Sequence, residues 1–509
     1  MPGIVYLVGA GPGDPGLLTL KGKALLERAD CVVYDFLANE DLLRYTRPGC
    51  RKVYAGKRAG RHTVTQERIN RLLVERARLG ETVVRLKGGD PFIFGRGGEE
   101  ALALAGAGIR FQVVPGVSAG HAVPAYAGIP LTHRGIGSSV SFLTAHGEDA
   151  VAPASGAAPA ADTMVFFMGA RNLPELTSVL LRQGYAPSTP AAVIRWGTTP
   201  DQEVITATIA DIAARAGKLA PPTIAVIGEV VNLRGQLNWF ERLPLFGKRV
   251  LVTRPREQAA SLREALAERG AQPVELPTLE IRDPESWEPL DDAVRRLAEF
   301  DFLLATSVNG VSKFLARLCA AGQDVRDLKG IEIGAIGPAT AAAFAAHGVR
   351  VDFMPREYRA EGLLEALKGR DVTGKSFLIP RARVARDVVP RVLTERGAQV
   401  EVIEAYYAAP PDYRPGELEA LLTPTPDMLT FTSSSTAVNF SSLPLREEIR
   451  AKLDKATVAS IGPVTSATLR ELGMRVDIEA RESTTAGLVQ ALEDHFSQDG
   501  RANESGGGQ

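Results

Sequence analysis

The chain has 509 residues, of which 45% are hydrophobic and 23% are charged, and its formal net charge at pH 7 is −1. Because one domain usually takes roughly 150 residues, this length predicts several globular units. The balanced charge argues against a general preference for nucleic acid or acidic membranes. Any anionic ligand therefore requires local clusters of basic side chains.

Signals for a membrane span, a disulfide framework or a metal site are missing from the sequence. No apolar run reaches the 18 residues of a span, and no basic targeting segment precedes the first strand-like run, which predicts a cytoplasmic protein. The three cysteines, Cys31, Cys50 and Cys319, show no CxxC spacing, and the six histidines form no HxxxH or HExxH pattern. We expect neither a disulfide framework nor a metal site.

Between residues 3 and 245, short β-branched runs alternate with helical stretches. The first strand-like runs lie at 4–8, 31–35, 51–55, 82–87 and 110–114. This βαβ rhythm predicts a largely parallel sheet. Residues 147–162 are rich in Ala, Pro and Gly and predict a mobile loop. The alternation resumes at Thr163.

The first glycine loop could be a plain turn or a dinucleotide-binding loop. Gly11, Gly13 and Gly16 satisfy G-x-G-x-x-G, and Asp35 ends the next strand, where a dinucleotide-binding protein carries its ribose-binding acid. Against a dinucleotide, two prolines stiffen the loop, and Asp14 followed by proline resembles a helix start.

Two further glycine-rich loops follow strands and open helices, at residues 85–100 and 113–120. Because the carboxyl ends of parallel strands share one edge of a sheet, the three loops place backbone N–H and C=O groups along that edge. Such an edge suits a ligand with polar ends and an aromatic base.

The second half contains a duplication with a period of about 126 residues. GKRVLVTRP at Gly247 recurs as GKSFLIPRA at Gly374, and TSVNGV at Thr306 recurs as TSSSTAV at Thr432. The repeat predicts two similar doubly wound parallel-sheet lobes, one from 246–282 with 410–495 and the other from 283–409. Residues 496–509 are polar and Gly-rich and predict a disordered tail.

Seven motifs of the first half stand in an order that carries a resemblance. They are GAGPGDPGLLTLKG, VYD, VYAGKRAG, VRLKGGDPFIFGRGGEE, PGVSAG, AGIPLTHRG and MGARNL. The set resembles the uroporphyrinogen-III C-methyltransferases of the tetrapyrrole methylase family. The resemblance implies α/β lobes at about 1–116 and 117–245, a homodimer, and S-adenosylmethionine bound between the lobes.

The same resemblance implies roles for individual residues. Asp35 would act as a base and Lys57 as an acid, although Asp35 could instead shape a turn and Lys57 bind a carboxylate. The substrate carboxylates would meet Arg58, Arg61, Arg96 and Arg134. The alternative for Asp90 is a cap on the following helix. The implied cofactor-binding residues are Pro12, Gly88, Gly89, Asp90, Ile93, Ser118, Ala119, Met168 and Gly197.

The second half resembles uroporphyrinogen-III synthase from LVTRP at Leu251 through AYYA to IGPVT at Ile461. The resemblance implies cyclisation of hydroxymethylbilane with inversion of the last pyrrole ring, without a metal or organic cofactor. Tyr406 would protonate the departing hydroxyl, unless it is a core tyrosine. The implied carboxylate-binding residues are Arg254, Thr306, Ser307, Arg381, Thr432, Ser433 and Ser434, of which the hydroxyl residues could instead cap helices.

Together, the two resemblances predict a bifunctional enzyme that makes uroporphyrinogen III and methylates it at C2 and C7 to precorrin-2, toward siroheme or cobalamin. Its expected partners are small tetrapyrrole substrates and a second copy of the chain, with no nucleic acid or membrane. Two alternatives remain open at this point. One half could be an inactive tetrapyrrole-binding or dimerising module, or the chain could be a dinucleotide-dependent oxidoreductase.

Overall fold

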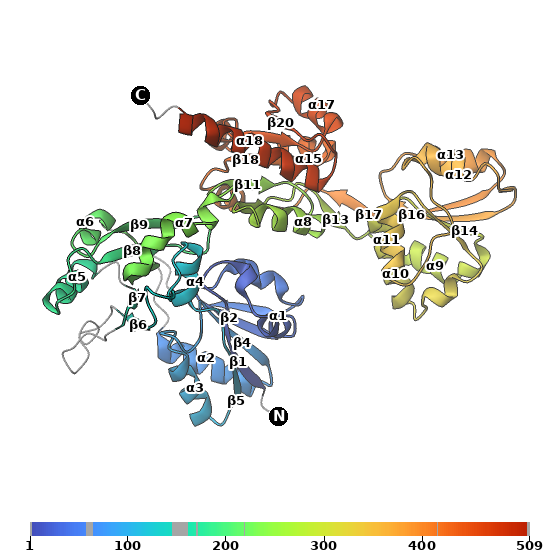
Figure 1. Cartoon of the computed structure of the whole chain (residues 1–509). Coiled ribbons are helices and arrows are strands. Elements are labelled where there is room, and N and C mark those ends of the chain that lie inside the picture. The colour runs from blue at the N-terminus through green and yellow to red at the C-terminus, as the bar shows by residue number, and fades with distance from the viewer. Residues whose placement is uncertain are drawn as a thin grey trace. The chain divides into compact units, whose positions relative to one another are not determined.

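A computed structural model of the chain describes residues 3–56, 65–144, 161–168, 172–217, 219–414 and 416–505 (Figure 1). The chain forms two compact units. The first unit contains 1–250, 264–273 and 492–509, and the second unit contains 251–263 and 274–491. The described residues form four five-stranded sheets, which we number in chain order.

The first sheet has the strand order β3-β2-β4-β1-β5, and all its neighbouring strands pair in parallel. Its strands are β1 (Ile4–Gly9), β2 (Cys31–Tyr34), β3 (Arg51–Tyr54), β4 (Thr82–Lys87) and β5 (Arg110–Val114). Helices α1 (Leu20–Leu26), α2 (Gln66–Arg78) and α3 (Gly97–Gly106) accompany them. Two apolar clusters, one including Leu73 and Leu104 and the other Leu25 and Leu26, bury the sheet on both faces, as parallel sheets require.

The second sheet has the order β6-β7-β10-β8-β9, and only β6 and β7 pair in parallel. Its strands are β6 (Val140–Thr144), β7 (Thr163–Phe167), β8 (Pro190–Arg195), β9 (Glu203–Thr208) and β10 (Thr223–Ile227). The prediction of a largely parallel sheet is therefore wrong here. The short link between β8 and β9 has no room for the crossover that parallel strands need, so these strands form an antiparallel pair.

Helices α4 (Ala119–Tyr126), α5 (Leu173–Arg182), α6 (Ile212–Ala216) and α7 (Arg234–Leu237) accompany the second sheet. The predicted mobile loop at 147–162 lies outside the described residues except for its last two positions.

The third and fourth sheets, β12-β11-β18-β19-β20 and β13-β17-β16-β14-β15, contain the duplicated sequence. The third sheet has β11 (Arg249–Val252), β12 (Gln272–Glu275), β18 (Met428–Phe431), β19 (Thr457–Ser460) and β20 (Ile478–Glu479). The fourth has β13 (Glu280–Arg282), β14 (Phe302–Ala305), β15 (Glu332–Ala335), β16 (Ser376–Ala382) and β17 (Gln399–Ala409). Strand β13 pairs with β17 antiparallel, whereas β14 with β15, β14 with β16, β16 with β17, β18 with β19 and β19 with β20 pair in parallel.

The repeat-related strands occupy matching places, because β12-β11-β18-β19 in one sheet corresponds to β17-β16-β14-β15 in the other. Strands β11 and β12 belong to the first copy of the repeat, whereas β18 and β19 belong to the second. In the fourth sheet this origin is reversed. Each sheet is therefore assembled from the beginning of one copy and the end of the other.

Helices of the second half follow the strands in both copies. They are α8 (Arg256–Ala267), α9 (Glu288–Arg295), α10 (Val308–Ala320), α11 (Pro338–Ala345), α12 (Ala360–Ala366), α13 (Val388–Glu395), α14 (Glu417–Leu421), α15 (Ser434–Ser441), α16 (Glu447–Leu453), α17 (Pro463–Glu471) and α18 (Thr485–Ser505). Helix α18 continues into the segment predicted to be disordered, since the chain from 493 to 505 lacks proline and holds one glycine, Gly500.

Among the described residues, we find no helix that combines the length and the apolar character needed to cross a membrane. The same residues contain no group of three or more His, Cys, Asp or Glu side chains arranged to hold a metal ion.

Candidate active sites

The three glycine loops of the first sheet contact one another through their backbones. The Gly89 N–H donates to the Gly11 carbonyl at 2.7 Å, and the Ala10 N–H donates to the Lys87 carbonyl at 2.7 Å. A Cβ added to Gly9 would lie 2.5 Å from the Cα of Gly116. Since a side chain cannot fit there, glycine is required where the first and third loops approach each other.

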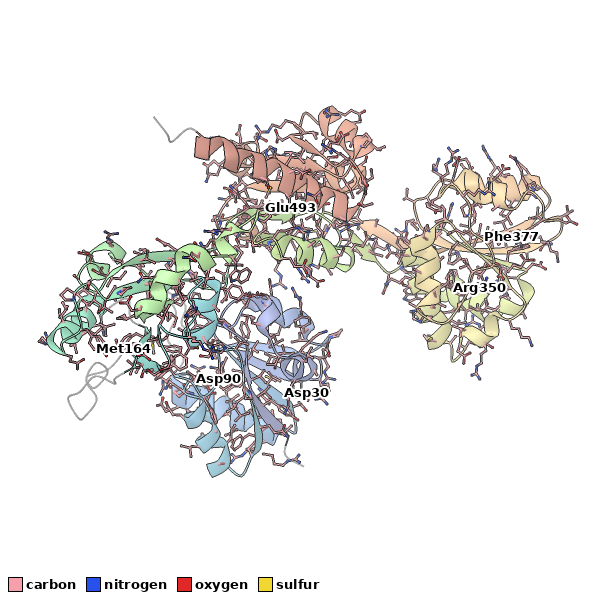
Figure 2. All side chains as sticks on the ribbon, viewed as in Figure 1. Asp30, Asp90, Met164, Arg350, Phe377 and Glu493 are labelled. Atoms are coloured by element: carbon pink, nitrogen blue, oxygen red, sulfur yellow. The ribbon has the colours of Figure 1, made fainter. Side chains whose placement is uncertain are left out.

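Asp90, labelled in Figure 2, joins the second loop to the third. Its Oδ1 accepts from the Phe92 N–H at 2.8 Å, and its Oδ2 accepts from the Gly116 N–H at 2.9 Å. Helix α3 begins at Gly97 with Arg96 as its N-cap, so Asp90 does not cap that helix. A carboxylate has about four acceptor sites, which leaves Asp90 able to accept from a ligand as well.

Ser118 and Ala119 stand at the start of α4, where the buried Ser118 hydroxyl caps the helix by accepting from the Gly120 N–H at 3.2 Å. A Cβ on Gly197 would lie 2.4 Å from the Val123 side chain. This close contact with α4 explains the glycine at position 197. The third loop and the β8–β9 link therefore meet at one helix.

The first loop, which contains Pro12, is also bonded to elements of the second sheet. The Asp14 N–H donates to Thr198 Oγ1 at 3.2 Å, and the Tyr126 hydroxyl donates to Asp14 Oδ2 at 2.7 Å. Burial, followed by the hydrogen bond to Asp14, raises the pKa of Tyr126 above its usual range, so its hydroxyl stays a donor.

Backbone strain concentrates in the loops that carry the predicted cofactor residues. Among the described non-glycine residues, φ is positive at Phe94 (52°), Arg96 (58°), Met168 (57°), Trp196 (48°) and Thr198 (70°). The Phe94 ring contacts the Phe167 ring at a centroid distance of 4.9 Å, which brings the second loop to the strand end before Met168. Ile93 and Met168 are exposed. Strain of this kind persists where surrounding contacts enforce it, typically at ligand sites.

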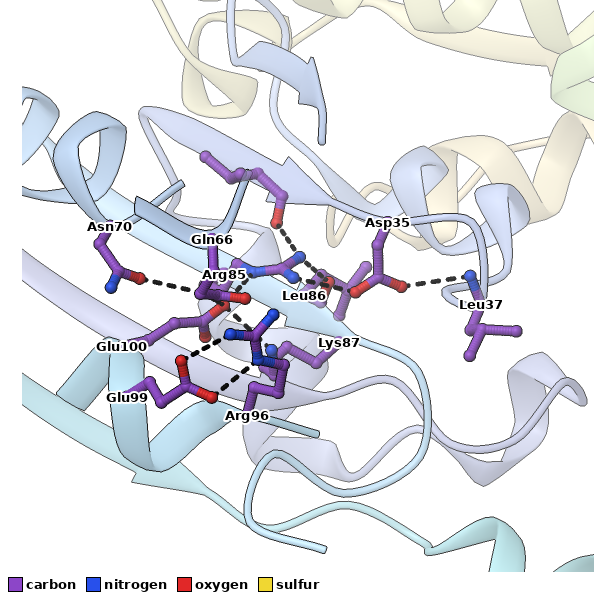
Figure 3. A network of polar contacts seen from close by, with 11 residues as sticks. Asp35, Leu37, Gln66, Asn70, Arg85, Leu86, Lys87, Arg96, Glu99 and Glu100 are labelled. Carbon is purple, nitrogen blue, oxygen red and sulfur yellow. Dashed lines mark hydrogen bonds and ion pairs between the residues drawn. The ribbon is translucent and has the colours of Figure 1, made fainter. Parts of the chain in front are cut away.

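Asp35, directly after β2, belongs to a network of charged side chains (Figure 3). Its Oδ2 accepts from Arg85 Nη2 at 3.0 Å, and its Oδ1 accepts from the Leu37 N–H at 3.2 Å. Arg85 is only 3% exposed, whereas the Asp35 side chain is 26% exposed. Asp35 thus shapes a turn, as the alternative prediction held, and also presents a carboxylate fixed by a buried guanidinium.

The basic residues predicted to bind substrate are described only in part. Lys57, Arg58 and Arg61 lie outside the described residues. Arg96 is exposed and donates to both oxygens of Glu99, each at 2.7 Å, and Arg134 is exposed.

In the fourth sheet, Tyr406 and Ser307 form a hydroxyl pair. The buried Tyr406 hydroxyl donates to Ser307 Oγ at 3.0 Å. Ser307 also caps α10 by accepting from the Gly310 N–H at 3.0 Å, and Thr306 precedes it in the same turn. Tyr406 is therefore buried, as the core-tyrosine alternative predicts, and Ser307 does cap a helix, as its alternative predicts.

In the part of the chain that the structure describes, the repeat-related turn of the third sheet has no tyrosine partner. Ser433 caps α15 by accepting from the Thr436 N–H at 3.3 Å, and its Oγ also lies 3.0 Å from the Ser435 Oγ. Thr432 precedes this cap, and Ser434 accepts from Thr468 Oγ1 at 2.8 Å.

Arg254 and Arg381 occupy the same position in the two copies of the repeat but have different partners. Arg381 pairs with Asp387, and its Nη1 donates to the Arg386 carbonyl at 3.0 Å. Arg254 Nη1 donates to Thr485 Oγ1 at 3.0 Å, and none of the described carboxylates pairs with it. Burial without such a partner lowers the pKa of Arg254, although an arginine stays charged at neutral pH.

Comparisons with known proteins match both halves of the chain. Residues 4–213 match the family of Tetrapyrrole (Corrin/Porphyrin) Methylases, and residues 260–490 match Uroporphyrinogen-III synthase HemD. The porphyrin biosynthesis protein HemD of Ruminiclostridium josui is 34% identical over 496 residues, which cover 96% of this chain and 97% of that protein. The chain belongs to the family that fuses these two enzymes.

Two further similarities include the methylase half. The uroporphyrinogen-III C-methyltransferase of Bacillus subtilis is 42% identical over 332 residues, covering 64% of this chain and 68% of that protein. A crystal structure of uroporphyrin-III-C-methyltransferase from Thermus thermophilus is 41% identical, covers 47% of this chain and 98% of that one, and gives a TM-score of 0.41.

The hypothesis of a fusion enzyme is therefore confirmed. The chain carries an S-adenosylmethionine-dependent uroporphyrinogen-III methyltransferase and a uroporphyrinogen-III synthase, both of which act on tetrapyrroles. This assignment replaces the alternative of a dinucleotide-dependent oxidoreductase. The glycine loop that suggested a dinucleotide is the first loop of the methylase fold.

Sequence reasoning missed three residues of the methylase half, namely Arg85, Lys87 and Glu100. The sequence does contain a signal for them. Two cations stand in the mostly apolar strand run TVVRLK, and two glutamates lie at the start of the next helix. Buried charges need partners, and this requirement predicts a bond between strand and helix.

Proposed function

We propose that the chain cyclises hydroxymethylbilane to uroporphyrinogen III and then methylates this product at C2 and C7 to precorrin-2, for siroheme or cobalamin synthesis. The presence of both enzymes in one chain supports this order of two reactions. A single relative matches the chain along 96% of its length. The product of the second half is the substrate of the first half.

In the methylase half, S-adenosylmethionine, when bound, supplies a methyl group activated by its sulfonium. Three features of this half support S-adenosylmethionine binding. Its three glycine loops lie in contact with one another, the Asp90 carboxylate has free acceptor capacity, and the apolar side chains of Ile93 and Met168 are exposed. The residues proposed to hold the cofactor are Pro12, Gly88, Gly89, Asp90, Ile93, Ser118, Ala119, Met168 and Gly197.

The chain's own groups would position the macrocycle and handle its proton. Asp35 would take the proton released from the pyrrole that becomes methylated, because its carboxylate is fixed by Arg85 and partly exposed. Arg96 and Arg134 would bind substrate carboxylates, with Arg58, Arg61 and the acid Lys57 as further proposals from the sequence motifs.

In the synthase half, Tyr406 would donate a proton to the departing hydroxyl of hydroxymethylbilane, and Ser307 would orient the tyrosine through their 3.0 Å bond. Thr306, Thr432, Ser433 and Ser434 would offer hydroxyls to carboxylates at the starts of α10 and α15. Arg254 would bind a carboxylate directly, whereas Arg381 would first have to release Asp387.

We propose further that the chain is a cytoplasmic homodimer assembled through the methylase half. Light scattering on the purified full chain tests the dimer. A mass corresponding to one chain would reject it.

The test of the two-step function is incubation of the purified chain with hydroxymethylbilane and methyl-labelled S-adenosylmethionine, followed by mass identification of the products. A doubly labelled type-III macrocycle is the expected result. Unlabelled type-III product would reject the methylation step, and unlabelled type-I product would reject both steps.

A further inference from the structure

Glu100, in the first turn of α3, is the most deeply buried carboxylate of the network in Figure 3. Its side chain is 0% exposed, and its Oε1 accepts from Arg85 Nε at 3.0 Å, Lys87 Nζ at 3.0 Å and Gln66 Nε2 at 3.2 Å. Its Oε2 is buried and has no partner among the described residues. A buried carboxylate is costly unless paired, and here two cations converge on one oxygen.

Strand geometry explains why both cations reach Glu100. Arg85 and Lys87 are two residues apart on β4, so their side chains point to the same face of the sheet. Burial, reinforced by the charge of Arg85, lowers the pKa of Lys87, and Glu100 acts against this effect. With Asp35, the network contains two carboxylates and two cations, so its formal charges balance.

Arg85 connects this buried pair to the partly exposed Asp35. Its Nε is held by Glu100, its Nη1 donates to the carbonyls of Val33 and Leu86 at 3.4 and 3.0 Å, and its Nη2 donates to Asp35. The planar guanidinium is therefore fixed at every nitrogen. Removing the Glu100 charge would weaken the contact at Nε and leave the guanidinium held mainly through Nη1 and Nη2.

Lys87 connects Glu100 to the glycine loops. Its carbonyl accepts from the Ala10 N–H at 2.7 Å, and Gly88 and Gly89 follow it directly. One buried carboxylate thus bonds to the side chain that fixes Asp35 and to the residue that leads into the second loop.

We propose that Glu100 is a positioning residue for methyl transfer, acting through Arg85 on Asp35. This inference rests on the proposed role of Asp35. Glu100 touches no reacting atom, so its effect is expected on the rate of the bound complex and not on substrate affinity.

The test compares Glu100→Gln with Glu81→Gln in the full chain. Glu81 is a matched control because it pairs with Arg76 at 3.5 Å, has a buried Oε2 without a described partner, and precedes β4 at the opposite end of the same strand. Methyl-transfer kcat and KM are measured for uroporphyrinogen III and S-adenosylmethionine. Synthase activity of the same molecules reports on folding of the second half.

For Glu100→Gln we expect kcat to fall by about tenfold to a hundredfold while both KM values stay within about threefold. Glu81→Gln should keep kcat within about twofold, since ordinary ion pairs outside the site affect stability alone. Equal kcat values for the two variants, or a loss carried by KM, would overturn the inference. Absence of methyl transfer in the unmodified chain would instead reject the proposed function.

If Glu100→Gln does not fold, the double variant Lys87→Met/Glu100→Gln takes its place, because it removes one charge of each sign. Arg85 still loses the negative charge of its inner partner, so kcat should remain low. Wild-type kcat in the folded double variant would overturn the inference.

Discussion

The two candidate active sites of this chain rely on different chemistry. In the methylase half, four formal charges lie in one bonded network, with Arg85 and Glu100 almost completely buried. In the synthase half, Tyr406 and Ser307 form a neutral pair, and the cation Arg254 has only a hydroxyl partner among the described residues. The first site holds its own counter-charges, whereas the second leaves a cation available.

This difference follows from what each reaction requires. In the proposed mechanism, methyl transfer needs one group that accepts a proton at a fixed position, and the buried guanidinium of Arg85 would hold the proposed base, Asp35, in place. Cyclisation starts from a flexible substrate with many carboxylates, so the protein must bind those charges and leave one proton donor near the departing hydroxyl. We therefore expect charge removal to affect kcat in the first half and KM in the second.

The largest effect should come from Asp35→Asn. The amide can still accept from the Leu37 N–H but cannot take a proton, so methyl-transfer kcat should fall by about a hundredfold or more. A methyl-transfer assay with labelled cofactor measures this loss, and unchanged synthase activity of the same chain is the control. Activity within threefold of the unmodified chain would remove Asp35 from proton transfer.

A smaller loss is expected for Tyr406→Phe in the synthase half. The substitution keeps the ring in the core cluster but removes the donor that bonds to Ser307, so synthase kcat should fall by about tenfold to a hundredfold. Product analysis by chromatography, with the type-I and type-III isomers separated, measures it. Full synthase activity with altered thermal stability would leave Tyr406 as a core residue only.

The pair Arg254→Met and Arg381→Met sharpens the comparison within the repeat. Loss of one charge-assisted contact should raise KM for hydroxymethylbilane by about tenfold in Arg254→Met. Arg381→Met should change KM by less than about threefold, because its charge is already paired with Asp387. Initial rates at varied hydroxymethylbilane concentration give KM for both variants. Equal KM values in the two variants would contradict the prediction that Arg254 contributes more to substrate binding than Arg381.

The smallest effect concerns pH and Lys87. Its pKa in the folded protein lies below its ordinary value of 10.5, so just below pH 10.5 the unfolded chain binds more protons and stability rises with pH. Lys87→Met removes this contribution. The melting temperature of the unmodified chain, minus that of the variant, should therefore increase from pH 8 to pH 10. A difference that stays constant would show that Lys87 is not perturbed.

Local sequence signals were sufficient to predict the glycine loops, the serine caps and the duplication. Ser307 and Ser433 each follow a strand run and precede a helix, and these caps depend on neighbours within three residues. The fusion itself was predictable because its motifs are ordered and dense. The individual site roles remain predictions.

Contacts between residues far apart in the sequence could not be predicted from such local signals. The antiparallel order of the second sheet depends on which strand neighbours β10, and nothing in the local runs at 163–167 and 223–227 distinguishes the two directions. Glu100 lies 13 residues from Lys87 and 34 from Gln66 along the chain, so its partners are set by how α3 packs on β4. Arg254 and Arg381 share a motif position, and they differ only in the side chains that the tertiary structure places beside them, Thr485 and Asp387.

Because each sheet of the second half combines strands from both copies of the repeat, the order of synthesis on the ribosome affects when each sheet can form. The Thr253 hydroxyl, directly after β11, donates to the Thr430 carbonyl, which lies 177 residues further along the chain. Strand β11 can therefore pair with β12 early, but its second neighbour, β18, is made much later. The first sheet, in contrast, is complete once β5 has emerged. The first sheet of the methyltransferase half can thus form early on the growing polypeptide, while the third sheet, in the synthase half, must wait for β18, β19 and β20.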